Sequence, residues 1–466
     1  MNKRLDSPVS LWTACRRTGD LSGRVVVTPA VRASLGELIG GSVLDGRGEE
    51  LRDRSVLIMT NDQFTAAMAL CELDGIARRI VLYPPDLAAD HLASVMESAQ
   101  VDALVSDRVS LGSGIPCIQS FMPSAERIVP QNSDRSAQVE TEWILLTSGT
   151  AGMPKLVVHT LASLAGAMAG AAPAKGVVWS TFYDIRRYGG LQIFLRAVLT
   201  GTSFVMSSST ESTAEFLSRA AANGVTHISG TPSHWRGALM SGHIQLLRPE
   251  CIRLSGEIAD AGILRQLRSS FPAARVVHAF ASTEAGVAFE VDDGLPGFSA
   301  GVLSGTPDVE MKIENQTLCI RSNRTARCYL GKNAAAVRDK DGFVNTGDVL
   351  ALREGRYQFV GRRDGMINVG GLKVHPEEVE AVLNRHQEVQ MSLVRTRKSP
   401  ITGAIVVADV VLRARAENDG RDVHEIRNDI LGFCRGMLPS HKVPAAINFV
   451  PALAVAESGK LIRSHA

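Results

Sequence analysis

The sequence has little that would bind a polyanion or a stack of bases. Lys and Arg together number 50 and Asp and Glu 48, so the net charge is only +2 and no bulk charge attracts a nucleic acid or an anionic membrane. Aromatic residues make up 5% of the chain, which disfavours an extended stacking surface for single strands. We therefore expect no nucleic-acid partner, and any anionic ligand must be bound by local charges.

The cysteines and the apolar segments exclude further classes of protein. The seven cysteines form no CxxC pair and no cluster with histidine, and their odd number favours reduced thiols over a disulfide framework or a zinc site. No uninterrupted apolar run reaches the roughly 18 residues of a membrane span, and charges interrupt the apolar segments near the start of the sequence. We therefore expect a cytoplasmic protein without a secretion signal or membrane span, as a monomer or homodimer.

What the sequence does contain is the pattern of a folded protein with several units. Its 466 residues are roughly three typical domain lengths, and 45% of them are hydrophobic. After a polar start, strand-like runs at 55–59, 79–83 and 102–107 alternate with helix-like segments at 64–77 and 91–100. This alternation predicts a parallel α/β sheet with crossover helices.

The pattern changes twice further along the chain. A later α/β stretch runs from about 204 to 289, and short alternating segments separated by turns begin near Gly305. After Arg362 a final unit combines two predicted helices with strands. The predicted fold class is therefore α/β, with a large N-terminal body of two α/β subdomains and a small β-rich subdomain, followed by a mobile α+β C-terminal domain.

A loop rich in small and hydroxyl residues follows a predicted buried strand. Residues 145–159 read LLTSGTAGMPKLVVH. Small residues let backbone N–H groups approach phosphate oxygens, while hydroxyls and Lys155 supply further donors. The spacing differs from the GxxxxGK[ST] phosphate loop, and the segment alone is equally compatible with an ordinary linker.

This loop closely resembles the TSGTTGxPKG signature of the adenylate-forming superfamily, which includes acyl-CoA and aryl-CoA ligases, peptide-synthetase adenylation domains and luciferases. Ala151 replaces the second threonine and Leu156 the last glycine. Further segments resemble the family's motifs in the family's order. In this loop, the resemblance implies that the ATP-binding residues are Thr147, Ser148, Gly149, Thr150, Ala151, Gly152 and Lys155.

Two further segments resemble the family's adenine and phosphate motifs. In LSGEI (254–258), Gly256 and Glu257 are implied to line the adenine, where a glycine gives a flat base a thin backbone wall. FASTE (280–284) is similar to YGxTE, with Phe280 and Ala281 in place of Tyr and Gly. The resemblance implies that Phe280, Ala281 and Ser282 contact the nucleotide, that Thr283 bonds the α-phosphate, and that Glu284 holds Mg²⁺, a hard cation that prefers oxygen ligands.

The next two segments resemble the family's ribose motif and its domain junction. Asp348, in NTGD (345–348), is implied to accept hydrogen bonds from both ribose hydroxyls, which suits the two oxygens of a carboxylate. In GRRDGMINVGGLKVHPEEVE (361–380), the resemblance implies that Arg362 contacts the ribose and that Asp364 is the hinge between domains 1–363 and 364–466. It also implies that Gly370 and Gly371 bind CoA and that Lys373 lies near the phosphates.

The segment at 443–463, VPAAINFVPALAVAESGKLIR, resembles the family's closing motif. A lysine near a chain end is usually a solvated surface group. Here the resemblance implies that Lys460 is the catalytic lysine and that Gly459 lets its loop enter the active site.

These motifs together lead to a functional hypothesis. The resemblance implies that the enzyme would activate a carboxylic acid with ATP as an acyl-AMP, release pyrophosphate and transfer the acyl group to the thiol of coenzyme A. Lys460 and Mg²⁺ on Glu284 would stabilise the charge of the transition state. The C-terminal domain would then exclude water and rotate to admit the thiol.

The acid pocket is predicted in an aromatic-rich region, which favours an aryl or otherwise bulky acid. A packed core edge is the alternative interpretation of each residue. The predicted pocket residues are Tyr183, Asp184, Tyr188, Trp235, Ser255 and Ala279.

Two alternative functions stay open. Asp184 lies where peptide-synthetase adenylation domains place an aspartate that pairs with an ammonium, so a standalone enzyme could load an aryl or amino acid onto a carrier protein, although Arg186 competes for this carboxylate. The Phe280, Ala281 and Ser255 departures would suit a catalytically silent nucleotide sensor. Retention of Glu284 and Lys460 favours an enzyme.

Overall fold

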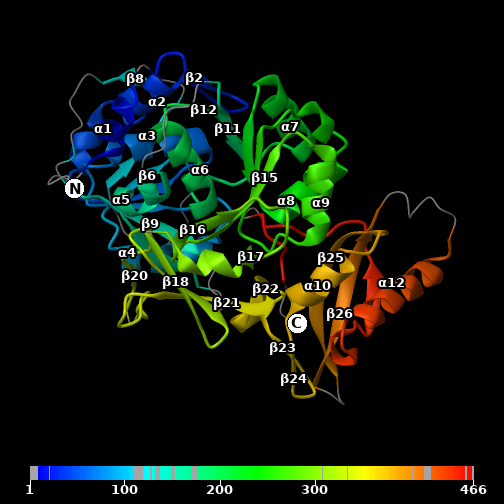
Figure 1. Ribbon diagram of the computed structural model, residues 1–466. Helices are drawn as coiled ribbons and strands as arrows, with labels where there is room; N and C mark the ends of the chain where they lie inside the picture. The colour runs from blue at the N-terminus through cyan, green and yellow to red at the C-terminus, as the bar shows by residue number, and fades with distance from the viewer. Residues whose placement is uncertain are drawn as a thin grey trace.

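The computed structural model describes the chain in a large N-terminal body and a smaller C-terminal unit (Figure 1). The residues outside the described part are 1–8, 20, 109–118, 126–127, 132–136, 138, 148–152, 169–175, 307, 333, 400–402, 414–420, 457–458 and 464–466. None of the helices in the described part has the length and apolarity that a membrane crossing requires.

The first large sheet of the body has seven strands, and neighbouring strands from β9 to β7 pair in parallel. Its strand β4 is buried along its whole length, which explains the continuous apolar run SVLIM. In spatial order the strands are β20 (Cys328–Leu330), β10 (Lys155–His159), β9 (Glu142–Thr147), β5 (Arg79–Leu82), β4 (Ser55–Met59), β6 (Ala103–Ser106) and β7 (Gln119–Phe121).

The second large sheet has eight strands, parallel from β15 to β1 with an antiparallel strand at each edge. In an open parallel sheet, ligands bind outside the carboxyl ends of the strands. The strands, in spatial order, are β16 (Gly286–Val291), β15 (Arg275–Ser282), β14 (Cys251–Leu254), β13 (His227–Gly230), β11 (Val178–Thr181), β12 (Ser203–Met206), β1 (Val25–Val27) and β2 (Arg32–Ser34).

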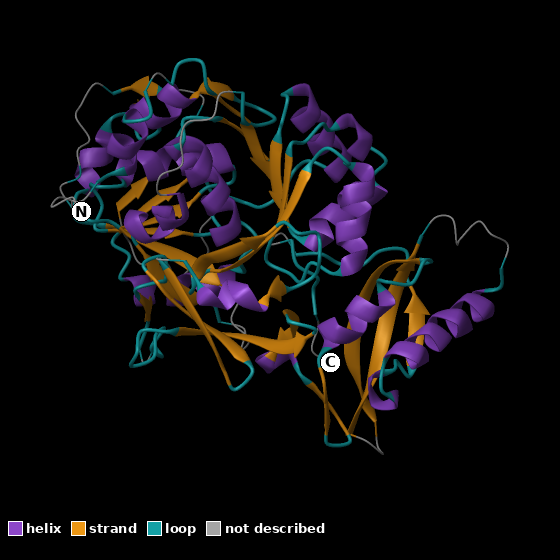
Figure 2. Cartoon of the chain, viewed as in Figure 1, coloured by secondary structure: helices purple, strands orange, loops and turns teal. Residues whose placement is uncertain are grey.

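Helices form layers around and between these two sheets (Figure 2). The largest apolar core joins both sheets to the helices between them, and every residue of α3 is buried there. The inner helices are α1 (Leu11–Arg16), α2 (Leu35–Gly40), α3 (Gln63–Leu73), α5 (Leu161–Ala165) and α6 (Tyr188–Leu199). The outer helices are α4 (Leu92–Ala99) on the first sheet, and α7 (Thr213–Ala222), α8 (Pro232–Met240) and α9 (Ala261–Ser270) on the second.

A small antiparallel sheet completes the body and has a core of its own. Its strands, in spatial order, are β17 (Phe298–Ser299), β22 (Arg356–Arg362), β21 (Val344–Arg353), β19 (Thr317–Ser322) and β18 (Val309–Glu314). A short antiparallel pair, β3 (Gly41–Ser42) and β8 (Val129–Pro130), lies elsewhere in the body.

In its described residues, the C-terminal unit packs two α-helices and a three-stranded sheet around a separate core. Its hairpin of β23 and β24 extends from the lower edge of the molecule in Figure 1, away from the large sheets. The elements are β23 (Ile367–Val369), β24 (Leu372–Val374), α10 (Pro376–Leu383), β25 (Val389–Ser399), β26 (Gly403–Leu412), α12 (Val423–Met437) and β27 (Ala446–Phe449).

The predicted fold class is confirmed, with one correction at the start of the chain. No strand was expected before Ser55, yet β1 and β2 lie there. They join the second sheet, because Val26 pairs with Phe204 of β12. The chain therefore begins in one large sheet, builds much of the other and then returns.

Candidate active site

The carboxyl ends of four parallel strands carry the predicted acid and nucleotide residues. Tyr183 follows β11, Thr231 follows β13, Ser255 to Glu257 follow β14, and Glu284 follows β15. The phosphate loop follows β9, but its residues Ser148, Gly149, Thr150, Ala151 and Gly152 lie outside the described part of the chain.

Lys460 reaches this edge from the C-terminal unit. Its segment turns back on itself, because the Ala456 N–H donates to the Lys460 carbonyl at 2.8 Å and Val455 bridges Leu461. The Lys460 Cε lies 3.7 Å from the point where a Cβ on Gly256 would stand. In Figure 1 the red end of the chain accordingly runs beside α8. The structure thus brings the predicted catalytic lysine to the predicted adenine wall.

Asp348 and Arg362 face each other on the small sheet, where β21 and β22 pair them in register. Burial raises the pKa of Asp348, although the positive charges of Arg362 and Lys460 act on the carboxyl in the opposite direction. Arg362 Nε also donates to Asp364 Oδ1 at 3.0 Å. Partial burial disfavours the charged form of Asp364, but the hydrogen bond and charge of Arg362 outweigh it and lower the pKa.

The β10 strand supports Thr283 and Glu284 from behind. His159 Nε2 lies 2.7 Å from the Thr283 carbonyl oxygen, while its Nδ1 contacts Ser163 Oγ at 2.9 Å. Burial lowers the pKa of His159 to about 4, so the ring is neutral at pH 7. A neutral ring that donates through Nε2 fixes the backbone of the predicted phosphate-binding residue.

Glu284 lies in a setting that suits a hard cation and a triphosphate. The Tyr329 hydroxyl donates to Glu284 Oε1 at 3.1 Å, and Lys155 Nζ lies 5.4 Å from the centre of the Tyr329 ring. Both side chains thus lie near Tyr329, where Glu284 would supply a carboxylate ligand to Mg²⁺ and Lys155 a positive charge to phosphate. Among the described residues, Glu284 belongs to no group of three or more His, Cys, Asp or Glu that could hold a metal ion, so most ligands of such an ion would come from the nucleotide and water.

The predicted acid pocket contains two buried tyrosines. The Tyr183 hydroxyl donates to the Ser255 carbonyl at 2.7 Å and lies 3.1 Å from its Oγ, while Tyr188 and Ala279 are also buried. Burial raises the pKa of both phenols. Tyr183 therefore links the pocket to the Gly256 wall, with its hydroxyl 3.7 Å from the point where a Gly256 Cβ would stand.

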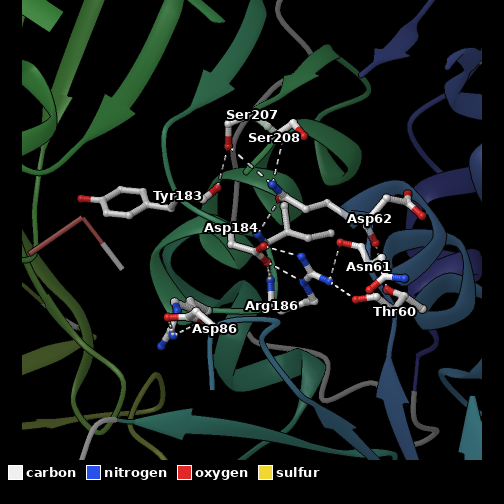
Figure 3. A network of polar contacts seen from close by, with 12 residues as sticks. Thr60, Asn61, Asp62, Asp86, Tyr183, Asp184, Arg186, Ser207 and Ser208 are labelled. Carbon is white, nitrogen blue, oxygen red and sulfur yellow. Dashed lines mark hydrogen bonds and ion pairs between the residues drawn. The ribbon is translucent and has the colours of Figure 1, made fainter. Parts of the chain in front are cut away.

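Trp235 and Asp184 have intramolecular partners. Trp235 is fully buried among the outer helices, with its ring 5.4 Å from that of Phe182. Arg186 binds both oxygens of Asp184, with Nε donating to Oδ1 at 2.8 Å and a second nitrogen to Oδ2 at 2.5 Å. Figure 3 shows the Tyr183 ring pointing away from this pair. Asp184 is thus bound within the chain, where the carrier-loading hypothesis places a substrate ammonium.

The CoA-binding residues expected from the sequence lie on the opposite part of the C-terminal unit. Gly370 and Gly371 form the turn of the β23–β24 hairpin with φ angles of 57° and 88°. The Gly371 N–H donates to Asn368 Oδ1 at 2.9 Å, and Lys373 is exposed on β24. In this arrangement Lys460 lies in the site, whereas the hairpin and Lys373 lie outside it.

The contacts of two polar pairs at the site were not predicted from the sequence. Thr231 and Glu257 bind the backbone on either side of Lys460, although the resemblance had implied a nucleotide role for Glu257. Arg253 of β14, two residues before Ser255, forms an ion pair with Glu290 of β16. No motif marks these pairs, although the threonine before Pro232 is a recognisable helix N-cap.

Comparisons with known proteins define the family. The family profile described as AMP-binding enzyme matches residues 54–330, and the one described as AMP-binding enzyme C-terminal domain matches 378–460. The chain belongs to the AMP-binding enzyme family.

Individual relatives are distant. The 2-succinylbenzoate–CoA ligase of Bacillus velezensis is 24% identical over 429 residues, covering 87% of this chain and 81% of that protein. A probable non-canonical nonribosomal peptide synthetase, CymA, of Salinispora arenicola is 25% identical over 404 residues, or 80% of this chain, which spans only 5% of that protein's length. The crystal structure of the anthranilate CoA ligase AuaEII with anthranoyl-AMP superimposes with a TM-score of 0.80 at 17% identity, covering 99% of this chain and 97% of that chain.

Proposed function

We propose that the enzyme activates a carboxylic acid as an acyl-AMP, releases pyrophosphate, and transfers the acyl group to the thiol of coenzyme A. The observation that carries the proposal is the position of Lys460 between the Gly256 wall and Asp348. A cation there suits a reaction in which negative charge develops at a phosphate.

The chain's own residues meet the main difficulty of this reaction, which is that the acid and ATP repel each other. Lys155, Arg362 and Lys460 supply local positive charge in a protein with a net charge of only +2. Asp348 would orient the ribose through its two oxygens, and Gly256 would admit the flat base. Mg²⁺, when held at Glu284, would neutralise phosphate oxygens and stabilise the departing pyrophosphate.

The two half-reactions would use different orientations of the C-terminal unit. We propose the division at Asp364, so that residues 1–363 bind ATP and acid and residues 364–466 move. With Lys460 in the site, the acid would attack the α-phosphorus of ATP. Rotation about Asp364 would withdraw Lys460 and bring Gly370 and Gly371 toward the acyl-AMP, where the thiol attacks the carbonyl and AMP leaves.

The acid is proposed to be aryl or otherwise bulky. Tyr183 and Tyr188 would supply flat, neutral walls, and Ala279 is a small buried side chain beside them in the predicted pocket. The similarity to a 2-succinylbenzoate–CoA ligase and to the fold of an anthranilate CoA ligase supports this class. Arg253, two residues before Ser255 and paired with Glu290, is a cation that would attract a second acidic group of the substrate.

Loading of a carrier protein is the second candidate, supported by the similarity to a peptide synthetase. The Asp184–Arg186 ion pair disfavours an amino acid in that role, because the carboxylate already has a cation. An aryl acid on a carrier stays compatible with the site.

A pyrophosphate-exchange screen tests the proposal, using aryl, medium-chain, dicarboxylic and amino acids with ATP and Mg²⁺. Exchange with at least one aryl or bulky acid is expected, followed by thioester formation with CoA. Exchange with a product formed only on a phosphopantetheinylated carrier would favour the second candidate. Complete absence of exchange across the panel would contradict both and favour a nucleotide sensor.

A further inference from the structure

The two peptide groups that flank Lys460 are both hydrogen-bonded to the N-terminal body. The Thr231 hydroxyl donates to the Gly459 carbonyl at 2.5 Å, on the N-terminal side of the lysine. The Leu461 N–H donates to Glu257 Oε1 at 3.1 Å, on its C-terminal side. These bonds join elements on opposite sides of the junction between the body and the C-terminal unit.

The body holds both partners in fixed positions. Thr231 is fully buried as the N-cap of α8, where its oxygen accepts a hydrogen bond from the His234 N–H at 3.0 Å. The second oxygen of Glu257 accepts from the Ser233 N–H in the first turn of the same helix at 2.9 Å. The α8 N-terminus therefore presents one hydroxyl donor and one carboxylate acceptor to the lysine loop.

The loop fits these partners closely. Gly459 lies against the His234 ring, since a Cβ on Gly459 would stand 1.9 Å from the ring's Cε1. A glycine is required at this point because any side chain would displace the loop or the ring, and its φ of 76° also favours glycine. Burial lowers the pKa of His234 to about 4, so the ring packs as a neutral group at pH 7.

On the C-terminal side the loop is anchored to its own unit by Arg463. Its guanidinium donates to both oxygens of Glu380, at 2.8 and 2.7 Å, and lies 3.6 Å from Glu377. Lys460 thus lies on a short segment held at both ends, by Arg463 to the moving unit and by Thr231 and Glu257 to the body.

We propose that Thr231 and Glu257 are positioning residues for adenylation, which hold the backbone of Lys460 and stabilise the orientation of the C-terminal unit that forms the acyl-AMP. This inference rests on the proposed function. Beyond that function, it states that two residues which need not touch the substrate determine the fraction of enzyme molecules in the orientation for the first half-reaction. They have no such part in the second half-reaction, in which Lys460 has left the site.

Substitution of each residue separates this role from nucleotide binding. Thr231→Val removes the hydroxyl at constant shape, whereas Thr231→Ser retains it as the matched control. Glu257→Gln keeps the size but turns one acceptor into an NH₂ group facing an N–H donor. Each disrupting variant is expected to lower the kcat of pyrophosphate exchange about tenfold, the scale of one lost hydrogen bond, and the double variant more.

Measurements of the second half-reaction and of the KM values distinguish a positioning role from a general structural role and from nucleotide binding. Thioester formation from supplied acyl-adenylate and CoA should stay within about twofold of wild type in all variants, and Thr231→Ser should match wild type in exchange. Equal losses in both half-reactions would overturn the proposal in favour of a general structural role. A raised KM for ATP at unchanged kcat would overturn it in favour of adenine binding by Glu257.

A measurement without substrates tests the docking itself. Hydrogen exchange of the Leu461 amide in the full chain should be slow in wild type and several-fold faster in Glu257→Gln, because Glu257 is its acceptor. Unchanged exchange at this amide would overturn the docking. If the wild-type enzyme adenylates no acid, the proposed function fails. Hydrogen exchange of the Leu461 amide still shows in that case whether the Lys460 loop is bound to the body.

Discussion

The C-terminal unit carries two glycine-containing turns that resemble family motifs, and their surroundings differ. The turn before Lys460 is bound by Thr231 and lies against His234 of the body. The turn at Gly371 is exposed, and its N–H is bonded to Asn368 in its own hairpin. The C-terminal unit therefore presents one motif to the site while the other faces away, and the proposed two half-reactions would use these motifs in turn.

The largest expected effect comes from removing the docked side chain. Lys460→Ala should reduce pyrophosphate exchange about a hundredfold or more, because the site loses the cation aimed at the reacting phosphate. Thioester formation from supplied acyl-adenylate should stay within about twofold.

Lys398→Ala, at an exposed lysine of the same unit, is the control and should behave as wild type in both assays. Full exchange activity in Lys460→Ala would show that the docked turn is not the catalytic one.

The next prediction tests whether the C-terminal unit rotates to replace the Lys460 turn with the Gly371 turn in the site. Asp364→Pro fixes a backbone φ angle at the proposed hinge and should lower thioester formation by tens of fold, while pyrophosphate exchange changes by only a few fold. Asp364→Asn keeps the backbone freedom and serves as the control. Equal loss of both half-reactions in the proline variant would rule out Asp364 as a hinge.

A smaller effect concerns the exposed turn. A Cβ on Gly371 meets no atom within 4 Å, so Gly371→Ala acts through its φ of 88°, which side chains disfavour. The KM for CoA should rise several-fold, with pyrophosphate exchange unchanged. Gly432→Ala, at a helical glycine of the same unit that also has free space, should change neither value. An unchanged KM for CoA in Gly371→Ala would place the thiol site elsewhere.

The smallest expected effect is a pH-dependent change in the free energy of unfolding, caused by His159 in the N-terminal body. The pKa of His159 is about 4 in the folded protein and near 6.5 when exposed, so the unfolded chain binds more protons between these values. Stability should therefore fall as the pH drops below about 6.5, by on the order of 1–2 kcal/mol at pH 5 from this one group. Urea unfolding at pH 7.5 and pH 5 measures the loss.

His159→Gln retains a donor for the Thr283 carbonyl but cannot titrate, so it should lose less stability on acidification than wild type. An identical loss in both proteins would mean that His159 is not the buried neutral group described. His234, whose pKa is also lowered to about 4, leaves part of the loss in either protein.

Local pattern predicted much of the fold, because the strands and helices of a parallel α/β sheet depend on short-range periodicity. The run at 55–59 is β4, and the run at 102–107 contains β6. The β1 strand was missed because three valines beside polar residues give no sign of a partner at Phe204. Pairings between distant strands depend on the whole sheet and not on the segment itself.

Those residues of the site that lie in family motifs could be predicted from the sequence. The resemblance placed Lys460, Gly256 and Asp348 in one site, and the structure brings these residues together. The contacts of Thr231 and Glu257 depend on how two units meet, which no local spacing encodes. The Asp184–Arg186 pair was partly foreseen, since residues two apart can pair where the chain turns, but its burial required the fold.

The position of β1 also bears on how the chain folds. During synthesis, β1 emerges long before β12, so Val26 can pair with Ala33 of β2 but has no partner on its other side until Phe204 has been made. Contacts of such high sequence separation slow folding, because a long loop must close before they form. One edge of β1 therefore stays unpaired for a long time, and the growing chain should depend on chaperones most strongly before residue 206 has left the ribosome.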